Sequence, residues 1–488
     1  MRSQCLVGAR TITTWIACAS LLACGSTAAT PDAGLPDASD DGSPPPTCPD
    51  AGVDPGLESA NAPAGTQLVA GDDLSVRAVT SDGWLIYSDD AALTLHAIEL
   101  AGGSTIDLGA TGAKFWVTSA GNVVFVWSNV TADGAGALTV WTAASGAHAL
   151  SSASLALVSA TDGARVLYVD GSDVFAASID GSGATKLVSH GAVAGCTPAL
   201  AFAPSYALVT HCDVPPTSSP SATVSAFSTA TWARTDLATG AENYFATAGA
   251  NVLVSVDGAG VRVVPAAGGA SVTVDSSGFL GVLVGGGATA LYGTRSGELR
   301  RSPVTSPSPA TLVASGFDGF WGLSPDEQWA LYFSTVSPTG GDAYLASTTT
   351  AGAPRSVASS GAVLGAAFTA SSSHALFTTD VDPCTGAGTL RAASVTGGAP
   401  SALGTNAWIA WSPSASKVVF ADGFFPTNDA RFGRADIELV DLAIGTSATR
   451  LVDRADAVLG LSPTGDRLVY AWSARPGALA GIWVAPLD

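Results

Sequence analysis

The stretch Trp321-Gly-Leu-Ser-Pro-Asp-Glu-Gln-Trp-Ala-Leu-Tyr-Phe333 decides the fold, because its pattern returns twice further along the chain. An apolar segment ends in Ser-Pro, a polar turn follows, and a second apolar segment ends in an aromatic residue. Apolar segments on either side of such a turn are typical of a β-hairpin. The other two copies are Trp408-Ile-Ala-Trp-Ser-Pro-Ser-Ala-Ser-Lys-Val-Val-Phe420 and Val458-Leu-Gly-Leu-Ser-Pro-Thr-Gly-Asp-Arg-Leu-Val-Tyr470.

Weaker copies of this hairpin extend the repeat back to residue 66, and a third and a short fourth apolar segment follow most of them. The mean step between turns is (465 − 83)/9, or about 42 residues, which suits one four-stranded propeller blade. We therefore predict an all-β protein, a β-propeller of four-stranded antiparallel blades. About ten units are recognisable, and since ten exceeds the usual range we expect 7–10 blades, with two rings or an open solenoid as alternatives. The predicted turns lie near residues 83, 121, 163, 205, 250, 286, 326, 372, 414 and 465.

The two ends of the array complement each other. The last unit stops after its third segment, Ile482-Trp-Val484, and lacks a fourth. Before the first hairpin, Gly65-Thr-Gln-Leu-Val-Ala70 has the pattern of the fourth segment Thr449-Arg-Leu-Val452. We expect this N-terminal strand to complete the last blade, which would close the ring and remove two open sheet edges.

The Ser-Pro turn, the apolar-aromatic strand behind it and the Ile-Trp-Val strand resemble the TolB-like (WD40-like) propeller repeat of bacterial periplasmic proteins. The resemblance is good over residues 320–488 and faint before them. It implies a binding module whose first partners are proteins.

The first 23 residues have the layout of a secretory signal, with Arg2 and Arg10 ahead of a short apolar run. The run ends in Leu21-Leu-Ala-Cys24, which resembles the lipobox of bacterial lipoproteins. The resemblance implies that Cys24 is acylated and becomes the first mature residue. An ordinary signal peptide with an incidental cysteine is the alternative. Gly25 stands where an Asp would signal inner-membrane retention, so the outer membrane is expected, with the protein facing the periplasm or the cell surface.

Residues 24–65 are rich in Pro, Gly and Asp, contain seven acids and no base, and show no apolar periodicity. Such a segment cannot bury enough surface to fold, so we expect a disordered acidic tether. The expected domains are thus a signal peptide (1–23), the tether (24–65) and the propeller (66–488). The whole chain has 40 acids and 20 bases, a net charge of −20, which argues against a nucleic-acid partner.

Two cysteines lie symmetrically about the predicted turn at residues 204–205, which favours a cross-strand disulfide between Cys196 and Cys212. His190 and His211 lie nearby, but strand alternation puts His211 on the opposite face from Cys212, so a metal site is not expected there. Cys48 and Cys384 remain as a further pair that number alone suggests.

Acidic and aromatic residues in the longer loops of the eighth and ninth units are the binding candidates, since rim loops usually carry a propeller's binding surface. Packing against a neighbouring blade is the alternative for the two phenylalanines. No cofactor is expected, except that a glycine-spaced aspartate trio offers a weak calcium site. The loop candidates are Asp382, Phe424, Phe425, Asp429 and Asp436, and the calcium candidates are Asp170, Asp173 and Asp180.

No catalytic residue is predicted. Gly322-Leu-Ser324 and Gly460-Leu-Ser462 resemble the start of a nucleophile elbow, but neither continues to Gly, and both are copies of the repeat turn. We expect a membrane-anchored envelope lipoprotein whose propeller binds or scaffolds proteins or polymers. The alternatives are an enzyme acting on an envelope or extracellular polymer with acids in its central channel, and a calcium or small-ligand sensor.

Overall fold

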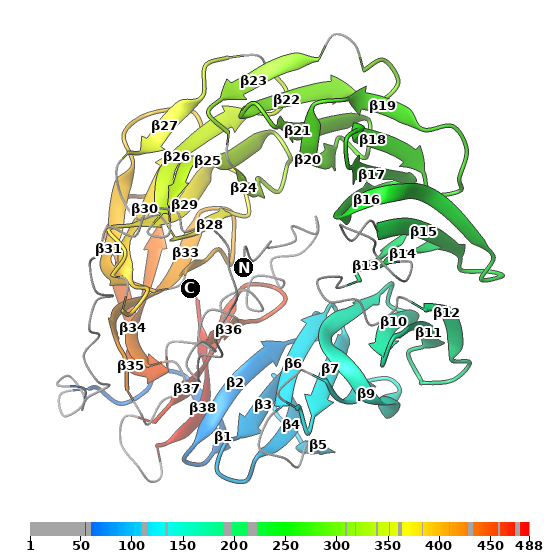
Figure 1. Ribbon diagram of the computed structural model, residues 1–488. Helices are drawn as coiled ribbons and strands as arrows, with labels where there is room; N and C mark the ends of the chain where they lie inside the picture. Colours follow the sequence, from blue (N-terminus) through cyan, green and yellow to red (C-terminus); the bar gives the residue numbers. More distant parts are fainter. Residues whose placement is uncertain are drawn as a thin grey trace, which may run out of the picture.

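The protein, as seen in a computed structural model, consists of β-strands joined by turns and loops (Figure 1). The part of the chain that the structure describes contains no helix that could span a membrane. The described residues are 54, 60–109, 115–131, 135–189, 198–212, 222–307, 310–317, 319–337, 340–350, 352–359, 364–382, 384–408, 410–427, 433–456, 459–473 and 479–487.

The strands of these ranges form ten antiparallel four-stranded blades, in agreement with the predicted β-propeller and its ten units. Blade 1 contains β2 (Leu74–Val79), β3 (Trp84–Asp89), β4 (Thr94–Glu99) and β5 (Ile106–Gly109). Blades 2 and 3 contain β6 (Phe115–Ala120), β7 (Val123–Ser128), β8 (Ala135–Thr142), β9 (Gly146–Thr161), β10 (Arg165–Asp170), β11 (Asp173–Ser178) and β12 (Thr185–Ser189). Blades 4 and 5 contain β13 (Leu200–Ala203), β14 (Tyr206–Cys212), β15 (Ala222–Ser228), β16 (Arg234–Ala248), β17 (Asn251–Val256), β18 (Gly260–Pro265) and β19 (Val272–Asp275).

The second half of the ring repeats the same unit. Blade 6 contains β20 (Gly278–Val284), β21 (Thr289–Thr294), β22 (Glu298–Pro303) and β23 (Thr311–Ser315). Blade 7 contains β24 (Gly319–Leu323), β25 (Trp329–Ser337), β26 (Gly340–Ser347) and β27 (Arg355–Ala358). Blade 8 contains β28 (Leu364–Phe368), β29 (His374–Thr379), β30 (Gly388–Ser394) and β31 (Ser401–Ala407). Blade 9 contains β32 (Ala410–Trp411), β33 (Lys417–Phe425), β34 (Arg434–Asp441) and β35 (Thr449–Asp456). Blade 10 contains β36 (Leu459–Leu461), β37 (Arg467–Trp472), β38 (Gly481–Pro486) and β1 (Thr66–Ala70).

Two long strands each serve two blades. The first half of β9 pairs with β8 as the fourth strand of blade 2, and its second half pairs with β10 as the first strand of blade 3. Ser154 is the corner, because it pairs with both Gly136 and Asp170. In β16 the corner is Ala241, which pairs with Ala222 and Val256. These pairings explain why blades 2 and 3, and likewise blades 4 and 5, share one continuous seven-stranded sheet.

The ring is closed as predicted, with the N-terminal strand as the outermost strand of blade 10. Thr66 of β1 lies opposite Val484 of β38, and Ala70 lies opposite Gly481. The sheets follow one another around one central axis (Figure 1). Apolar side chains fill the space between each blade and the next, and the last such cluster joins blade 10 back to blade 1 through Ile482 and Leu85. Burying both faces of every blade is the main source of stability in this arrangement.

Hydrogen bonds within the hairpin explain why a hydroxyl residue recurs at these turns. The Oγ of Ser324 accepts a bond from the backbone N–H of Trp329 (2.9 Å) and donates to Asp326 (2.5 Å). Ser462 accepts a bond from the N–H of Arg467 in the same way (3.0 Å). Thr80 occupies the equivalent position in blade 1 and accepts from the N–H of Trp84 (2.9 Å). These hydroxyls terminate the first strand of a blade, so the prediction that the elbow-like serines are turn residues is confirmed.

Because the strands are antiparallel, each blade has two different ends. One end carries the turns between the first and second strands and between the third and fourth. The other end carries the connections between the second and third strands and the crossings to the next blade. We call this second end the loop face.

Candidate functional site

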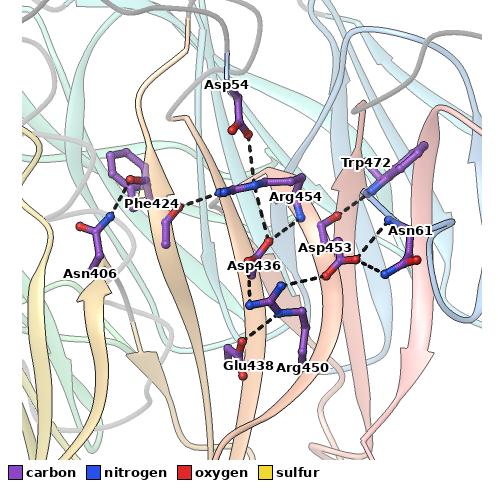
Figure 2. Close-up of polar contacts among 11 residues, drawn as sticks. Asp54, Asn61, Asn406, Phe424, Asp436, Glu438, Arg450, Asp453, Arg454 and Trp472 are labelled. Carbon is purple, nitrogen blue, oxygen red and sulfur yellow. Dashed lines mark hydrogen bonds and ion pairs between the residues drawn. The ribbon is translucent and has the colours of Figure 1, made fainter. Parts of the chain in front are cut away.

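The densest group of charged side chains lies in blade 9. Asp436 and Glu438 are two residues apart on β34, so strand alternation places them on the same side of the sheet. Arg450 of the neighbouring strand β35 reaches both, with Nη2 3.1 Å from Asp436 Oδ2 and Nε 3.1 Å from Glu438 Oε1. Its Nη1 lies 3.3 Å from Asp453 Oδ1. One guanidinium therefore holds three carboxylates (Figure 2).

A second arginine extends this group toward the loop face. The Nη1 of Arg454 donates to the backbone oxygen of Gly423 (2.8 Å), and its own backbone N–H donates to Asp436 Oδ1 (3.0 Å). Its Nε lies 3.4 Å from Asp54 Oδ2. Arg454 has a φ of +52°, in the left-handed region, which departs from the regular strand. We call Asp436, Glu438, Arg450, Asp453 and Arg454 the blade-9 network.

In this network, pairing favours the charged forms of Asp453 and Arg450 against the effect of burial. Burial opposes ionisation of Asp453, but hydrogen bonds from Asn61 and Arg450 outweigh it and hold the pKa of this carboxyl below its usual value. Burial likewise disfavours the charged form of Arg450, yet Glu438, Asp436 and Asp453 raise its pKa above the ordinary value. A carboxylate and a guanidinium held in this way do not exchange protons near neutral pH. The network is therefore suited to structural pairing and not to general acid–base chemistry.

Residues upstream of β1 bind the same network. The backbone N–H of Asn61 donates to Asp453 Oδ2 (3.1 Å), and the side-chain amide of Asn61 donates to the same oxygen. Ala60 is buried in the apolar cluster between blades 9 and 10. Asp54 and residues 60–65 were assigned to the tether from sequence, so the part of the chain that contacts the ring begins upstream of residue 66.

Of the predicted binding residues, the structure brings Asp436 and Phe424 to blade 9 and buries both. Asp436 lies within β34 and belongs to the network rather than to a loop. Phe424 is 7% exposed and stacks on Trp408 with ring centroids 4.9 Å apart, so it packs between strands instead of projecting from a loop. Phe425 is half-buried, Asp382 is exposed, and Asp429 lies outside the described residues.

The three calcium candidates do not meet. Asp170 and Asp173 flank the turn between β10 and β11, whereas Asp180 follows the far end of β11. At about 3.3 Å per residue, the strand separates Asp173 from Asp180 by roughly 20 Å. Asp173 pairs with Lys186 (2.7 Å), and Asp180 accepts bonds from Ser182 within its own turn. No group of three potential metal ligands occurs among the residues described.

The structure describes only one cysteine of each suggested pair. Cys212 and Cys384 are both disulfide-bonded. Cys196 and Cys48 lie outside the described residues, as does Cys24, so the pairing of Cys196 with Cys212 stays a prediction. Beside Cys212, the fully buried His211 has its Nε2 2.9 Å from Ser225 Oγ.

The innermost strands of the ten blades carry almost no charge. Glu242 on β16 is the one acid within the bounds of these strands, and Arg77 on β2 is the one base. The Nη2 of Arg77 lies 2.6 Å from Asp90, so this base is paired. Trp116 and Trp411 on two of these strands are partly buried against the apolar clusters. An axial site built from several carboxylates therefore has no support in these strands.

Sequence reasoning singled out Asp436 but missed its partners. Arg450, Asp453 and Arg454 were visible only as charged residues in a fourth strand. The available signal was the alternation in Asp436-Ile-Glu438, where two acids share a face of a strand that is otherwise buried. Buried acids need a cation opposite them, and the next strand supplies it.

No family model matches the chain, and no curated protein is similar to it in sequence. Several solved structures are similar in fold. The tricorn protease is 11% identical, with a TM-score of 0.32 over 86% of this chain and 53% of that chain. Dipeptidyl peptidase 4 of Porphyromonas gingivalis is 12% identical, with a TM-score of 0.45 over 84% and 63%. AztD of Citrobacter koseri, in its apo form, is 12% identical, with a TM-score of 0.35 over 74% and 92%. The chain thus spans about half the length of the tricorn protease. The likeness concerns the fold alone.

Proposed function

We propose that the protein is a lipid-anchored, non-catalytic binding platform of the bacterial envelope, which presents its propeller to a protein or a polymer. The supporting observation is the distribution of charge. The innermost strands hold one acid, Glu242, while the buried acids of blade 9 are taken up by Arg450 and Arg454. The buried charges of blade 9 thus pair with one another within the blade, and we assign recognition to the exposed rims.

The loop face is the side we assign to the partner. The candidates Asp382 and Phe425 lie there, at the connections between second and third strands of blades 8 and 9. Asp54 contacts Arg454 near the same end of β35, so the tether joins the propeller on this side. The resemblance of the Ser-Pro repeats to the TolB-like propeller adds proteins as the first class of partner to test.

The anchor rests on Cys24 and its lipobox-like context. Fully extended, residues 24–53 span at most about 100 Å, which allows the ring to work at a distance from the membrane surface. The net negative charge of residues 66–488 would also keep the ring from lying against anionic lipid headgroups. The location we propose is the outer membrane, facing the periplasm or the cell surface.

Metabolic labelling with radioactive palmitate tests the anchor, with Cys18→Ala as a matched control in the same segment. We expect label in the wild type and in Cys18→Ala, and loss of label together with release from membranes in Cys24→Ala. Wild-type protein that takes up no label would refute the anchor.

Site-specific photo-crosslinking in cells tests the binding face. A photoreactive residue at Asp382 should give a defined cross-linked species. The control position is Ile444, which is 89% exposed in the turn at the opposite end of blade 9. Cross-links from Ile444 and none from Asp382 would contradict the assignment of the loop face.

A further inference from the structure

The segment ahead of β1 does more than lead into the ring. Asp54 and residues 60–65, which we call the clasp, contact blade 9 through Asp54 and Asn61 (Figure 2). They also contact blade 10, through Ala64, before the chain enters β1. The strand β1 itself has five residues and an irregularity between Gln67 and Val69. Like the outer strands of the other blades, β1 pairs on one side only, so contacts ahead of it can add to the closure.

The contacts of the clasp with blade 9 are polar, and they come from the buried Asp54 and the exposed Asn61. The side chain of Asp54 is fully buried, and its Oδ2 lies 3.4 Å from Arg454 Nε. Asn61 gives two hydrogen bonds to one carboxylate oxygen of Asp453, whose side chain is 11% exposed. Hydrogen bonds to a charged acceptor are stronger than those between neutral groups, and both bonds from Asn61 go to one such acceptor.

The contacts with blade 10 are apolar and backbone-directed. Ala60 is 3% exposed in the cluster that joins blades 9 and 10. The hydroxyl of Tyr470 donates to the backbone oxygen of Ala64 (2.5 Å), and burial raises the pKa of this hydroxyl, which keeps it a donor. Gly65 has a φ of +94°, and a Cβ there would lie 2.2 Å from the backbone oxygen of Val484. A side chain at this position of the clasp would collide with the backbone of β38.

We propose that the clasp locks the ring by bridging blades 9 and 10, and that it shields β1 from pull or cleavage in the tether upstream. The chain order supports this role, because any displacement of the tether reaches the contacts of Asp54 and Asn61 before it reaches β1. Opening the ring from the tether side would then require Arg454 to lose Asp54 and Asp453 to lose Asn61 before β1 is reached. The inference does not depend on lipidation or on the identity of the partner.

Hydrogen exchange on the full chain tests the clasp, with Asp54→Asn combined with Asn61→Ala. Both changes lie outside the blades, so the ten sheets keep their own residues. We expect amides of β1 and β38 to exchange about tenfold faster, while those of β22 and β23 in blade 6 keep the wild-type rate. The matched control is Asp257→Asn, which removes a carboxylate from an exposed pair with Arg295 and should change neither region.

Two results would overturn the proposal. Unchanged exchange of β1 and β38 in the double variant would mean that β1 closes the ring unaided. An equal rise in every blade would mean that the segment adds general stability and does not act at the seam. If the double variant gives too little protein, Asn61→Ala alone should still raise exchange at β1 by a smaller factor, and its failure to do so would count equally against the clasp.

Discussion

Single residues in this propeller act mainly by neutralising buried charge. Arg450 is half-exposed, but the three carboxylates that it pairs with are each about one-tenth exposed. Arg450 therefore stabilises the fold mainly by offsetting the mutual repulsion of three buried carboxylates, and less through any single ion pair. Removing one partner of a buried pair costs more than the pair contributes, because the remaining charge stays desolvated.

Arg450→Ala should accordingly lower the free energy of unfolding by about 2 kcal/mol, below the range for a fully buried pair because Arg450 is half-exposed. Arg450→Lys should recover only part of this, since a lysine lacks the planar fork that reaches Glu438 and Asp436 together. Chemical denaturation measures the effect. The control Arg295→Ala, at an exposed pair with Asp257, should cost less than about 0.5 kcal/mol. Equal losses for the two alanine variants would contradict the role of Arg450.

The lowered pKa of Asp453 predicts a dependence of stability on pH. The charged groups around it are Arg450, which it contacts, and Asp436, Glu438 and Arg454 of the same network. Because the folded-state pKa lies below the ordinary 3.8, ionised Asp453 stabilises the fold above about pH 4, and this contribution is lost as the pH falls through the folded-state pKa.

Melting curves between pH 2 and pH 6 check this prediction with Asp453→Asn. The variant should be less stable than the wild type at pH 6, and the difference should shrink as the pH falls below 4. A difference that stays constant over the whole range would show that Asp453 does not contribute through its charge.

At the scale of elements, the hairpin between the first and second strands carries most of what the sequence could predict. All ten predicted turns fall between those two strands of a blade. The reason is local, since a hydroxyl at the end of the first strand accepts the N–H that starts the second, as Ser324 and Ser462 do. The corners within β9 and β16 were not predicted, because Ser154 and Ala241 have no special turn chemistry and bend only where two blades meet.

The hairpin hydroxyl gives a prediction at this scale. Ser324→Ala should destabilise the protein by about 1 kcal/mol, because the N–H of Trp329 and the carboxylate of Asp326 lose their partner. Ser324→Thr should be near neutral, since Thr80 makes the same bond in blade 1. Thermal melting of the two variants distinguishes them, and an equal loss in both would mean that the hydroxyl is not what matters.

Across the whole molecule, the periodicity predicted a ring and its closing strand, and both predictions are confirmed. The clasp could not be predicted, because its residues and their partners are separated by hundreds of residues and meet only once the ring has formed, and the pairing within the blade-9 network depends on the register of β34 and β35. Asn61 and Asp453, for example, lie 392 positions apart. The composition of residues 24–65 predicted the opposite, because an acidic Pro- and Gly-rich segment is expected to make no contact with the folded domain.

Closure of the ring as a whole can be tested by deleting residues 66–70 from the full chain. Without β1, the outer edge of β38 loses its partner, and the clasp is drawn away from Tyr470 and Asp453 by the shortened connection to β2. We expect a fall in melting temperature and, because an unpaired edge recruits other chains, self-association that rises with concentration. The control shortens the exposed turn around Ile444, which lies between β34 and β35 on the opposite end of blade 9. Calorimetry and sedimentation on both variants separate the outcomes. If the two deletions behaved alike, β1 would be an ordinary outer strand, and the ring would be held by its apolar interfaces alone.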